Sequence, residues 1–90
     1  MRVITKNIVG AFLQRIKKAS GNTTSNGTSL FLHGNEIARH TPQGLEITNA
    51  GWFSPTTKER LNALPNVSIA QKARVWYLNG IEWNGEWKLV

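Results

Sequence analysis

Pairs of turn-forming residues divide this chain into short segments, and this division limits the folds that it can adopt. Asparagine–glycine pairs occur at three places, Asn26-Gly27, Asn79-Gly80 and Asn84-Gly85. Such pairs accept the positive φ angles of the tight turns that join neighbouring antiparallel strands. Further turn signals containing Gly or Pro lie at 33–35 and 41–44. The chain is therefore predicted to form an antiparallel meander of short strands.

The predicted strands alternate with these turns. Residues 45–48 show the clearest pattern, because two apolar residues alternate there with Glu46 and Thr48, as in a sheet with one face in water. The stretch 21–28 is rich in Gly, Asn, Ser and Thr, and it is either a linker or the start of a hairpin. The expected strands are Ser29–Leu32, Glu36–His40, Leu45–Asn49, Val67–Gln71, Arg74–Leu78, Ile81–Trp83 and Glu86–Val90.

An N-terminal amphipathic helix is predicted over residues 7–19. Five apolar residues fall on one arc of its helical wheel: Ile8, Val9, Phe12, Leu13 and Ile16. Asn7 is a suitable N-cap and Ser20-Gly21 a suitable stop. A short chain has little core, so we expect the apolar face to dock on the sheet and leave Arg15, Lys17 and Lys18 exposed.

A central helix is predicted over Pro55–Leu64, with Ser54 as its N-cap and Pro65 ending it. We expect its charged and amide side chains to face outward or sideways: Lys58, Glu59, Arg60 and Asn62. The free amides at its start, near Lys58 and Arg60, are also able to bind a phosphate, but plain N-terminal capping is favoured because Glu59 repels an anion.

These elements define an α+β fold: a small antiparallel sheet of short strands with an N-terminal amphipathic helix and one central helix. Ninety residues allow one domain, 1–90, which we divide into a basic helical extension, 1–21, and an α+β body, 22–90. The chain has no Cys, so neither disulfides nor Cys-bound zinc can stabilise it. We expect most of the four Trp residues to be recruited to packing.

The charge of the chain is concentrated near its start. Residues 1–35 carry five basic and no acidic side chains, a net +5, and residues 36–90 carry six basic and five acidic ones, a net +1. Such a segment attracts nucleic acid, an anionic membrane or an acidic protein. No stretch approaches the roughly 18 apolar residues that span a bilayer, and no secretory signal is recognisable. We expect no membrane partner and a location in the cytoplasm.

Part of the chain resembles a family of small phage-encoded proteins with no assigned activity. The resemblance covers about residues 22–90 and rests on Ser29–Ala38 (SLFLHGNEIA), Asn49–Trp52, Thr56–Asn62, Trp76–Gly80 and Trp83. Residues 1–21 are expected to lie outside the shared region. The resemblance implies a bacterial host cell as the setting and, by analogy with other small phage accessory proteins, an inhibitor of host machinery as one function.

No catalytic or metal-binding motif is recognisable. His33 and Glu36 are close enough in sequence to act as an acid–base pair, but a polar strand turn explains His33 more simply. His33 and His40 are too few for a metal site without Glu residues brought in by the fold. We expect no enzyme activity, no metal and no cofactor.

Two functions remain. The first is a non-enzymatic phage protein that inhibits a host nucleic-acid-handling or defence complex, of the anti-CRISPR type, by occupying a surface; the second is direct, weakly sequence-selective binding of DNA or RNA, in which an exposed Trp beside Arg74 would stack bases. Oligomeric state is left open. The residues expected to contact the partner or nucleic acid are Lys6, Arg15, Lys17, Lys18, Lys58, Arg60, Lys72 and Arg74.

Overall fold

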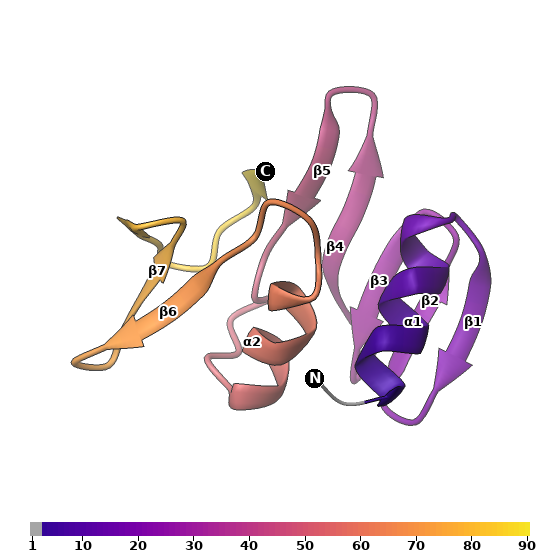
Figure 1. The fold of residues 1–90 in the computed structure, drawn as a ribbon, viewed down its shortest axis with the longest axis horizontal. Helices are drawn as coiled ribbons and strands as arrows, with labels where there is room; N and C mark the ends of the chain where they lie inside the picture. Colours follow the sequence, from indigo (N-terminus) through magenta and orange to yellow (C-terminus); the bar gives the residue numbers. More distant parts are fainter. Residues whose placement is uncertain (1–2) are drawn as a thin grey trace.

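The computed structural model describes residues 3–90, and their side chains from Lys6 onward. It has two helices and nine short strands in that range, so the predicted α+β class is confirmed (Figure 1). The elements are α1 (Val3–Leu13), β1 (Lys17–Ser20), β2 (Thr23–Asn26), β3 (Ser29–Leu32), β4 (Asn35–Thr41), β5 (Gly44–Ile47), α2 (Pro55–Asn62), β6 (Ile69–Lys72), β7 (Val75–Leu78), β8 (Ile81–Glu82) and β9 (Lys88–Leu89).

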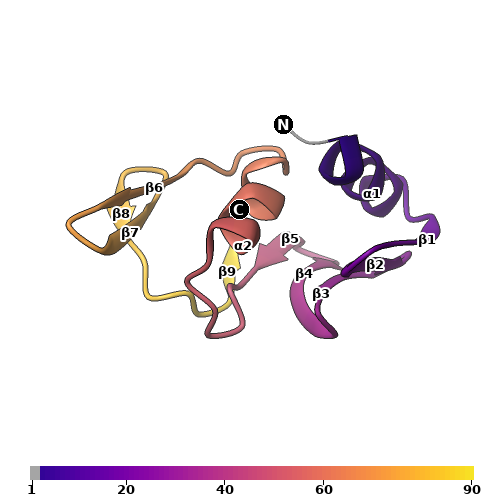
Figure 2. The ribbon, with the colours of Figure 1, turned by 90° about the horizontal axis from the view of Figure 1, so that it is seen from below.

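The strands form two antiparallel sheets. Six strands make the larger sheet in the order β1-β2-β3-β4-β5-β9, and β6-β7-β8 make a smaller one. Both helices lie on one side of the larger sheet, and the smaller sheet lies beyond α2 (Figure 2). The opposite side of the larger sheet carries no helix in the described part of the chain, and we call it the open face.

The tight turns follow the predicted chemistry in two hairpins and depart from it in a third. His33-Gly34 joins β3 to β4, and Asn79-Gly80 joins β7 to β8, with both residues of each pair at positive φ. The β6–β7 turn has the same form but consists of Ala73 and Arg74, at φ 51° and 67°. Arg74, predicted to begin a strand, therefore lies in a turn that Asn and Gly normally occupy.

The core lies between the helices and the sheet. From α1, Ile8, Val9 and Phe12 are buried, and they cluster with inward residues of the sheet such as Leu30 and Ile47. The His40 ring stacks on Phe12 at 4.4 Å, and its Nε2 lies 2.8 Å from the Phe12 carbonyl oxygen. The predicted docking of the N-terminal helix on the sheet is confirmed.

The predicted end of this helix is wrong, because α1 stops at Leu13 and residues 17–20 form a strand. The amide of Ile16 donates to the Ala11 carbonyl at 2.8 Å and that of Arg15 to Phe12 at 3.0 Å. These bonds and the positive φ of Arg15, 59°, make a Schellman C-cap, in which Arg15 takes the place usual for Gly. Asn7 lies within the helix and does not cap it.

The start of α2 agrees with its prediction. The Ser54 hydroxyl accepts a hydrogen bond from the Thr57 amide at 3.1 Å, and Pro55 occupies the first turn. The stretch 21–28, left open between linker and hairpin, contains β2. Gly85 does not make a hairpin turn: it is buried, and its carbonyl accepts bonds from Thr48 and Asn49, which ties the C-terminal segment to the end of β5.

Candidate binding surfaces

The eight basic residues predicted to form one binding surface lie in separate places. The first group is Lys6, Arg15, Lys17 and Lys18, all exposed, on α1, the α1–β1 connection and β1. We call this group the basic corner. Lys18 and Lys6 line a shallow hollow of about 380 Å³ between α1 and β1. The predicted exposure of Arg15, Lys17 and Lys18 is confirmed, although none of the three lies on a helix.

The next two residues lie at the far end of the molecule. Lys72 and Arg74 are exposed at the tip of the β6–β7 hairpin, at the opposite end of the long axis from α1 and β1 (Figure 1). The molecule extends 36 Å along that axis. Lys58 is half-buried on α2, and its ammonium donates to the Gln71 side chain at 3.3 Å. These residues do not extend the basic corner.

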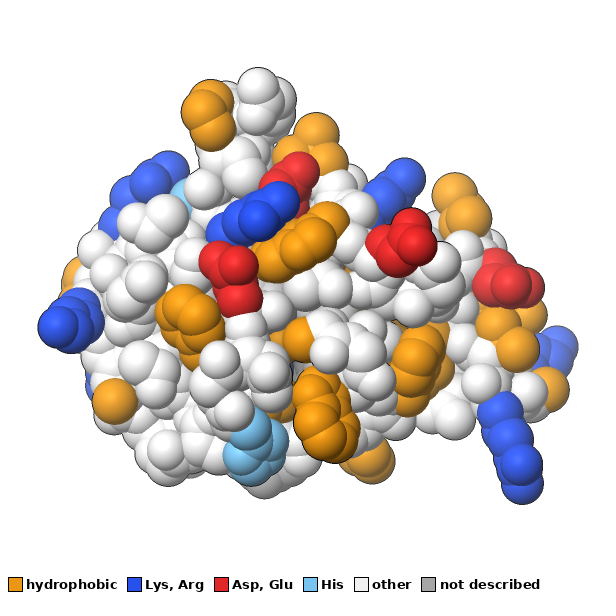
Figure 3. Space-filling model, turned by 180° about the vertical axis from the view of Figure 1, so that it is seen from behind, with side chains coloured by type: hydrophobic (Ala, Val, Ile, Leu, Met, Phe, Trp, Pro, Cys, Tyr) orange, Lys and Arg blue, Asp and Glu red, His pale blue; other side chains and the backbone are white. Residues whose placement is uncertain are grey.

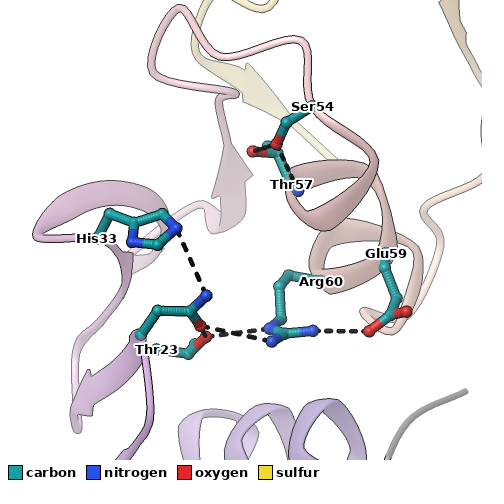
Figure 4. A network of polar contacts seen from close by, with 7 residues as sticks. Thr23, His33, Ser54, Thr57, Glu59 and Arg60 are labelled. Atoms are coloured by element: carbon teal, nitrogen blue, oxygen red, sulfur yellow. Dashed lines mark hydrogen bonds and ion pairs between the residues drawn. The ribbon is translucent and has the colours of Figure 1, made fainter.

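Arg60, the last of the eight, is a buried structural residue, so its predicted outward position is wrong. Only 1% of its surface is exposed. Its Nε donates to the Thr23 hydroxyl at 3.0 Å, and its Nη1 pairs with the Glu59 carboxylate at 2.6 Å (Figure 4). A longer contact of 3.5 Å joins Nη2 to Asn22 Oδ1. The guanidinium therefore links α2 to the β1–β2 hairpin and does not face a partner.

The two side chains considered for acid–base chemistry have separate partners. The ring of His33 contacts the Asn22 side-chain amide at 3.4 Å. The Glu36 carboxylate accepts a short hydrogen bond from the Ser29 hydroxyl. Among the side chains from Lys6 onward, no three His, Asp or Glu lie close enough to hold a metal ion, and no helix in 3–90 is long and apolar enough to cross a membrane.

The open face of the larger sheet agrees with the prediction of a sheet with one face in water, but the residues that gather on it were not anticipated from the sequence. Strand register places Phe31 opposite Glu36 and Arg39 opposite Glu46, and side-chain alternation directs all four away from the helices. Trp87 covers the Arg39 guanidinium, with Cζ 3.8 Å from the ring centroid. Arg39 Nε also donates to Glu46 at 2.8 Å. Figure 3 views the molecule from this side and shows hydrophobic side chains as separate patches among charged ones.

The loop before α2 adds two more exposed aromatic side chains, Trp52 at 60% and Phe53 at 54%. Trp52 lines a pocket of about 270 Å³ together with His33 and residues from the start of α2. The buried Asn49 holds this loop: its Oδ1 accepts the Gly51 amide at 2.8 Å, and its carbonyl accepts the Trp52 amide at 2.9 Å.

The expectation that most of the four tryptophans pack in the core is wrong, because only two of them do. Trp76 is buried, so the tryptophan beside Arg74 is not exposed to stack bases, and Trp83 is buried as well; Trp52 and Trp87 are exposed at 60% and 37%. The alternation of Arg39 and Glu46 with buried neighbours was the sequence signal for the open face. It did not identify Trp87, which reaches Arg39 only because β9 pairs with β5.

These features define a small two-helix α+β protein with one uncovered sheet face and a basic corner. The chain belongs to the Kyanoviridae Gp96 protein family, a family of phage proteins, whose model matches residues 1–88. The match begins at residue 1, so the expectation that residues 1–21 lie outside the shared region is wrong. No curated protein and no solved structure matches the chain.

Proposed function

We propose that this phage protein is a non-enzymatic binding protein that occupies a surface of a host nucleic-acid-handling or defence complex. On this proposal it acts in the host cytoplasm as an inhibitor of the anti-CRISPR type. The observation that carries the proposal is the exposure of three aromatic side chains, Trp87 on the open face and Trp52 and Phe53 in the loop before α2, which we together call the aromatic surface although they form separate patches. Membership of a phage family supports a host target.

The composition of this surface suits a protein partner. Trp and Arg are enriched at the centres of protein interfaces, and Lys and Glu are depleted there. The open face holds Trp87 and Arg39, and its acidic residues Glu36 and Glu46 are already hydrogen-bonded to Ser29 and Arg39. These acidic residues would repel a phosphate backbone. Protein binding therefore ranks above nucleic-acid binding at this face.

The surface is also held rigid before any partner arrives. Trp87 packs on Arg39, which is itself fixed by Glu46, and the Asn49 side chain holds the Trp52 loop. An aromatic side chain that is already ordered loses less conformational entropy on binding, so more of its contact energy appears as affinity.

Direct binding of DNA or RNA is the second candidate, and the basic corner favours it. The structure reduces the cations available to it, since Arg60 is buried and the pair Lys72 and Arg74 lies at the other end. Of the eight predicted residues, only the four of the basic corner remain together. If phosphate contacts dominate, affinity for generic DNA will fall steeply as the salt concentration rises. Removing Lys17 and Lys18 will then lower the slope of log affinity against log salt concentration by about two.

Affinity capture from infected host cells tests the proposal. The tagged protein should retain one protein complex in stoichiometric amount after nuclease treatment, and Trp52→Ala should lose it. Ile81→Ala is the matched control, because Ile81 is an even more exposed apolar residue, at 71%, on the smaller sheet. Capture that is equal for Trp52→Ala and wild type, or that disappears after nuclease treatment, would overturn the proposal.

A further inference from the structure

Strand β1 forms one edge of the larger sheet, and its outer side has no partner strand within residues 3–90. The Asn22 carbonyl accepts the His33 amide at 2.8 Å, so Asn22 directs its backbone towards β3. Backbone groups alternate in direction along an antiparallel ladder, and the registered pairs of β1 and β2 then leave the amide and carbonyl groups of Lys17 and Ala19 pointing outwards. The edge therefore offers free backbone donors and acceptors.

The two lysines of this edge lie on opposite sides of the sheet. Lys17 is paired with the exposed Asn26 and lies on the open side, whereas Lys18 is paired with the buried Ser25 and lies on the helix side. No acidic residue occurs in the first 35 positions of the chain. An extended segment running along the edge therefore meets a positive charge above and below its own backbone.

A hollow accompanies the edge on the helix side. It lies between α1 and β1 and is lined by Lys6, Gly10, Ala11, Ile16 and Lys18, with Ile16 exposed at 49%. Gly10 opens towards unfilled space, since a Cβ added there would meet no atom within 4 Å. Glycine weakens a helix interior, so its presence keeps the hollow open at some cost in helix stability.

We propose that the β1 edge binds an extended acidic segment of a partner protein as an added antiparallel strand. Backbone hydrogen bonds to Lys17 and Ala19 supply affinity that does not depend on the sequence of the segment, and side-chain contacts supply the selectivity. When the segment pairs with β1 in this way, two of its adjacent residues lie opposite Lys17 and Lys18, and both are acidic in the proposed segment. The next residue lies opposite Ile16, on the helix side, where an apolar side chain enters the hollow.

The charge on the edge selects this occupant over others. Lysines on an edge strand repel a second basic edge, and a second copy of this chain would bring a net +6 and the same lysines. A phosphate backbone lying on one side of the sheet meets only one of Lys17 and Lys18, and the outward carbonyl groups repel it. An acidic strand satisfies the backbone and both charges.

The test uses a fluorescent peptide, Thr-Thr-Glu-Glu-Leu-Thr-Thr, and measures its polarisation on titration with the full chain. Saturable binding is expected, with the amide resonances of Lys17 and Ala19 shifting in the protein spectrum. The same peptide with Gln in place of Glu should bind about two- to thirtyfold more weakly, since two exposed ion pairs are lost. A version N-methylated at alternate amides should not bind, because it cannot join a ladder.

Variants of the protein provide a second test, in which the peptide is kept and the binding edge is changed. Lys17→Glu with Lys18→Glu should weaken peptide binding at least about tenfold, and the matched reversal at the hairpin tip, Lys72→Glu with Arg74→Glu, should leave it unchanged. Gly10→Leu should weaken binding by filling the hollow, without lowering the melting temperature, because Leu is a better helix former than Gly.

Three results would overturn the inference: equal binding of the N-methylated peptide, equal binding by the Lys17→Glu, Lys18→Glu variant, or failure of the acidic peptide to bind while a 20-nucleotide oligothymidylate binds at the same edge. The last outcome would assign the edge to nucleic acid. Trp52→Ala should leave peptide binding intact, so failure here is distinct from failure of the aromatic surface.

Discussion

Replacing Arg60 tests the structure at the position where it departs furthest from the sequence pattern. On a solvent-facing helix position, Arg60→Ala changes the free energy of unfolding by less than about 0.5 kcal/mol. In the structure, the same change removes a side chain that is 1% exposed, with its bonds to Thr23 and Glu59. A solvent-facing Arg60 and a buried Arg60 therefore predict different stabilities for the Arg60→Ala variant.

The expected magnitude follows from what the removal leaves behind. Breaking a buried ion pair by deleting one partner costs about 3–5 kcal/mol. The Glu59 side chain is 27% exposed, so water can resolvate its carboxylate. The Thr23 hydroxyl still donates to Asn22 at 2.8 Å and is not orphaned. Both facts place the cost of Arg60→Ala in unfolding free energy near the lower end of this range, at about 3 kcal/mol. Arg60→Met, which keeps most of the buried stem, should cost about 1–2 kcal/mol.

Urea unfolding followed by circular dichroism measures these differences, with Lys72→Ala as the control at an exposed cation. The denaturant slopes should agree, so that the midpoints report stability directly. A loss below about 0.5 kcal/mol for Arg60→Ala, or one no larger than that of Lys72→Ala, would refute the buried link between α2 and β2.

Three further changes test the backbone of the fold by the same urea titration. Arg15→Gly should stabilise the protein by about 1 kcal/mol, because Gly takes the left-handed conformation of the α1 C-cap without strain; no gain would argue against that cap. Ala73→Asn with Arg74→Gly should stabilise the β6–β7 turn by about 1–2 kcal/mol, and a loss of stability would contradict its type I′ form. Gly85→Ala should destabilise by more than about 2 kcal/mol, since its Cβ would lie 2.1 Å from Asn49 Oδ1; a neutral result would disprove this close contact.

The turns and strands of the middle of the chain were predictable because their signals are local. His33-Gly34 and Asn79-Gly80 adopt positive φ as their residue types favour, and the strand Ser29–Leu32 was predicted with the observed bounds. The start of α2 at Ser54-Pro55 is equally local, since a hydroxyl and a missing amide act on the first turn alone.

The end of α1 was not predictable in the same way. Apolar spacing continues through Ile16 as it would in a helix, and the C-cap is formed by Arg15 where Gly is usual. Lys17–Ser20 shows no strand pattern of its own and becomes a strand by pairing with β2. The placement of Lys17 and Lys18 on a sheet edge thus depends on a partner strand.

The sequence by itself determined the α+β class, the tight turns at His33-Gly34 and Asn79-Gly80 and the concentration of positive charge near the start of the chain, because these depend on residue type and near neighbours. The tertiary structure decided which polar residues are buried and which aromatic ones are exposed. Arg60 is buried because it meets Thr23, 37 positions away, and Trp87 stands on the open face because β9 pairs with β5. Burial depends on contacts between distant residues, and those contacts exist only once the elements have packed.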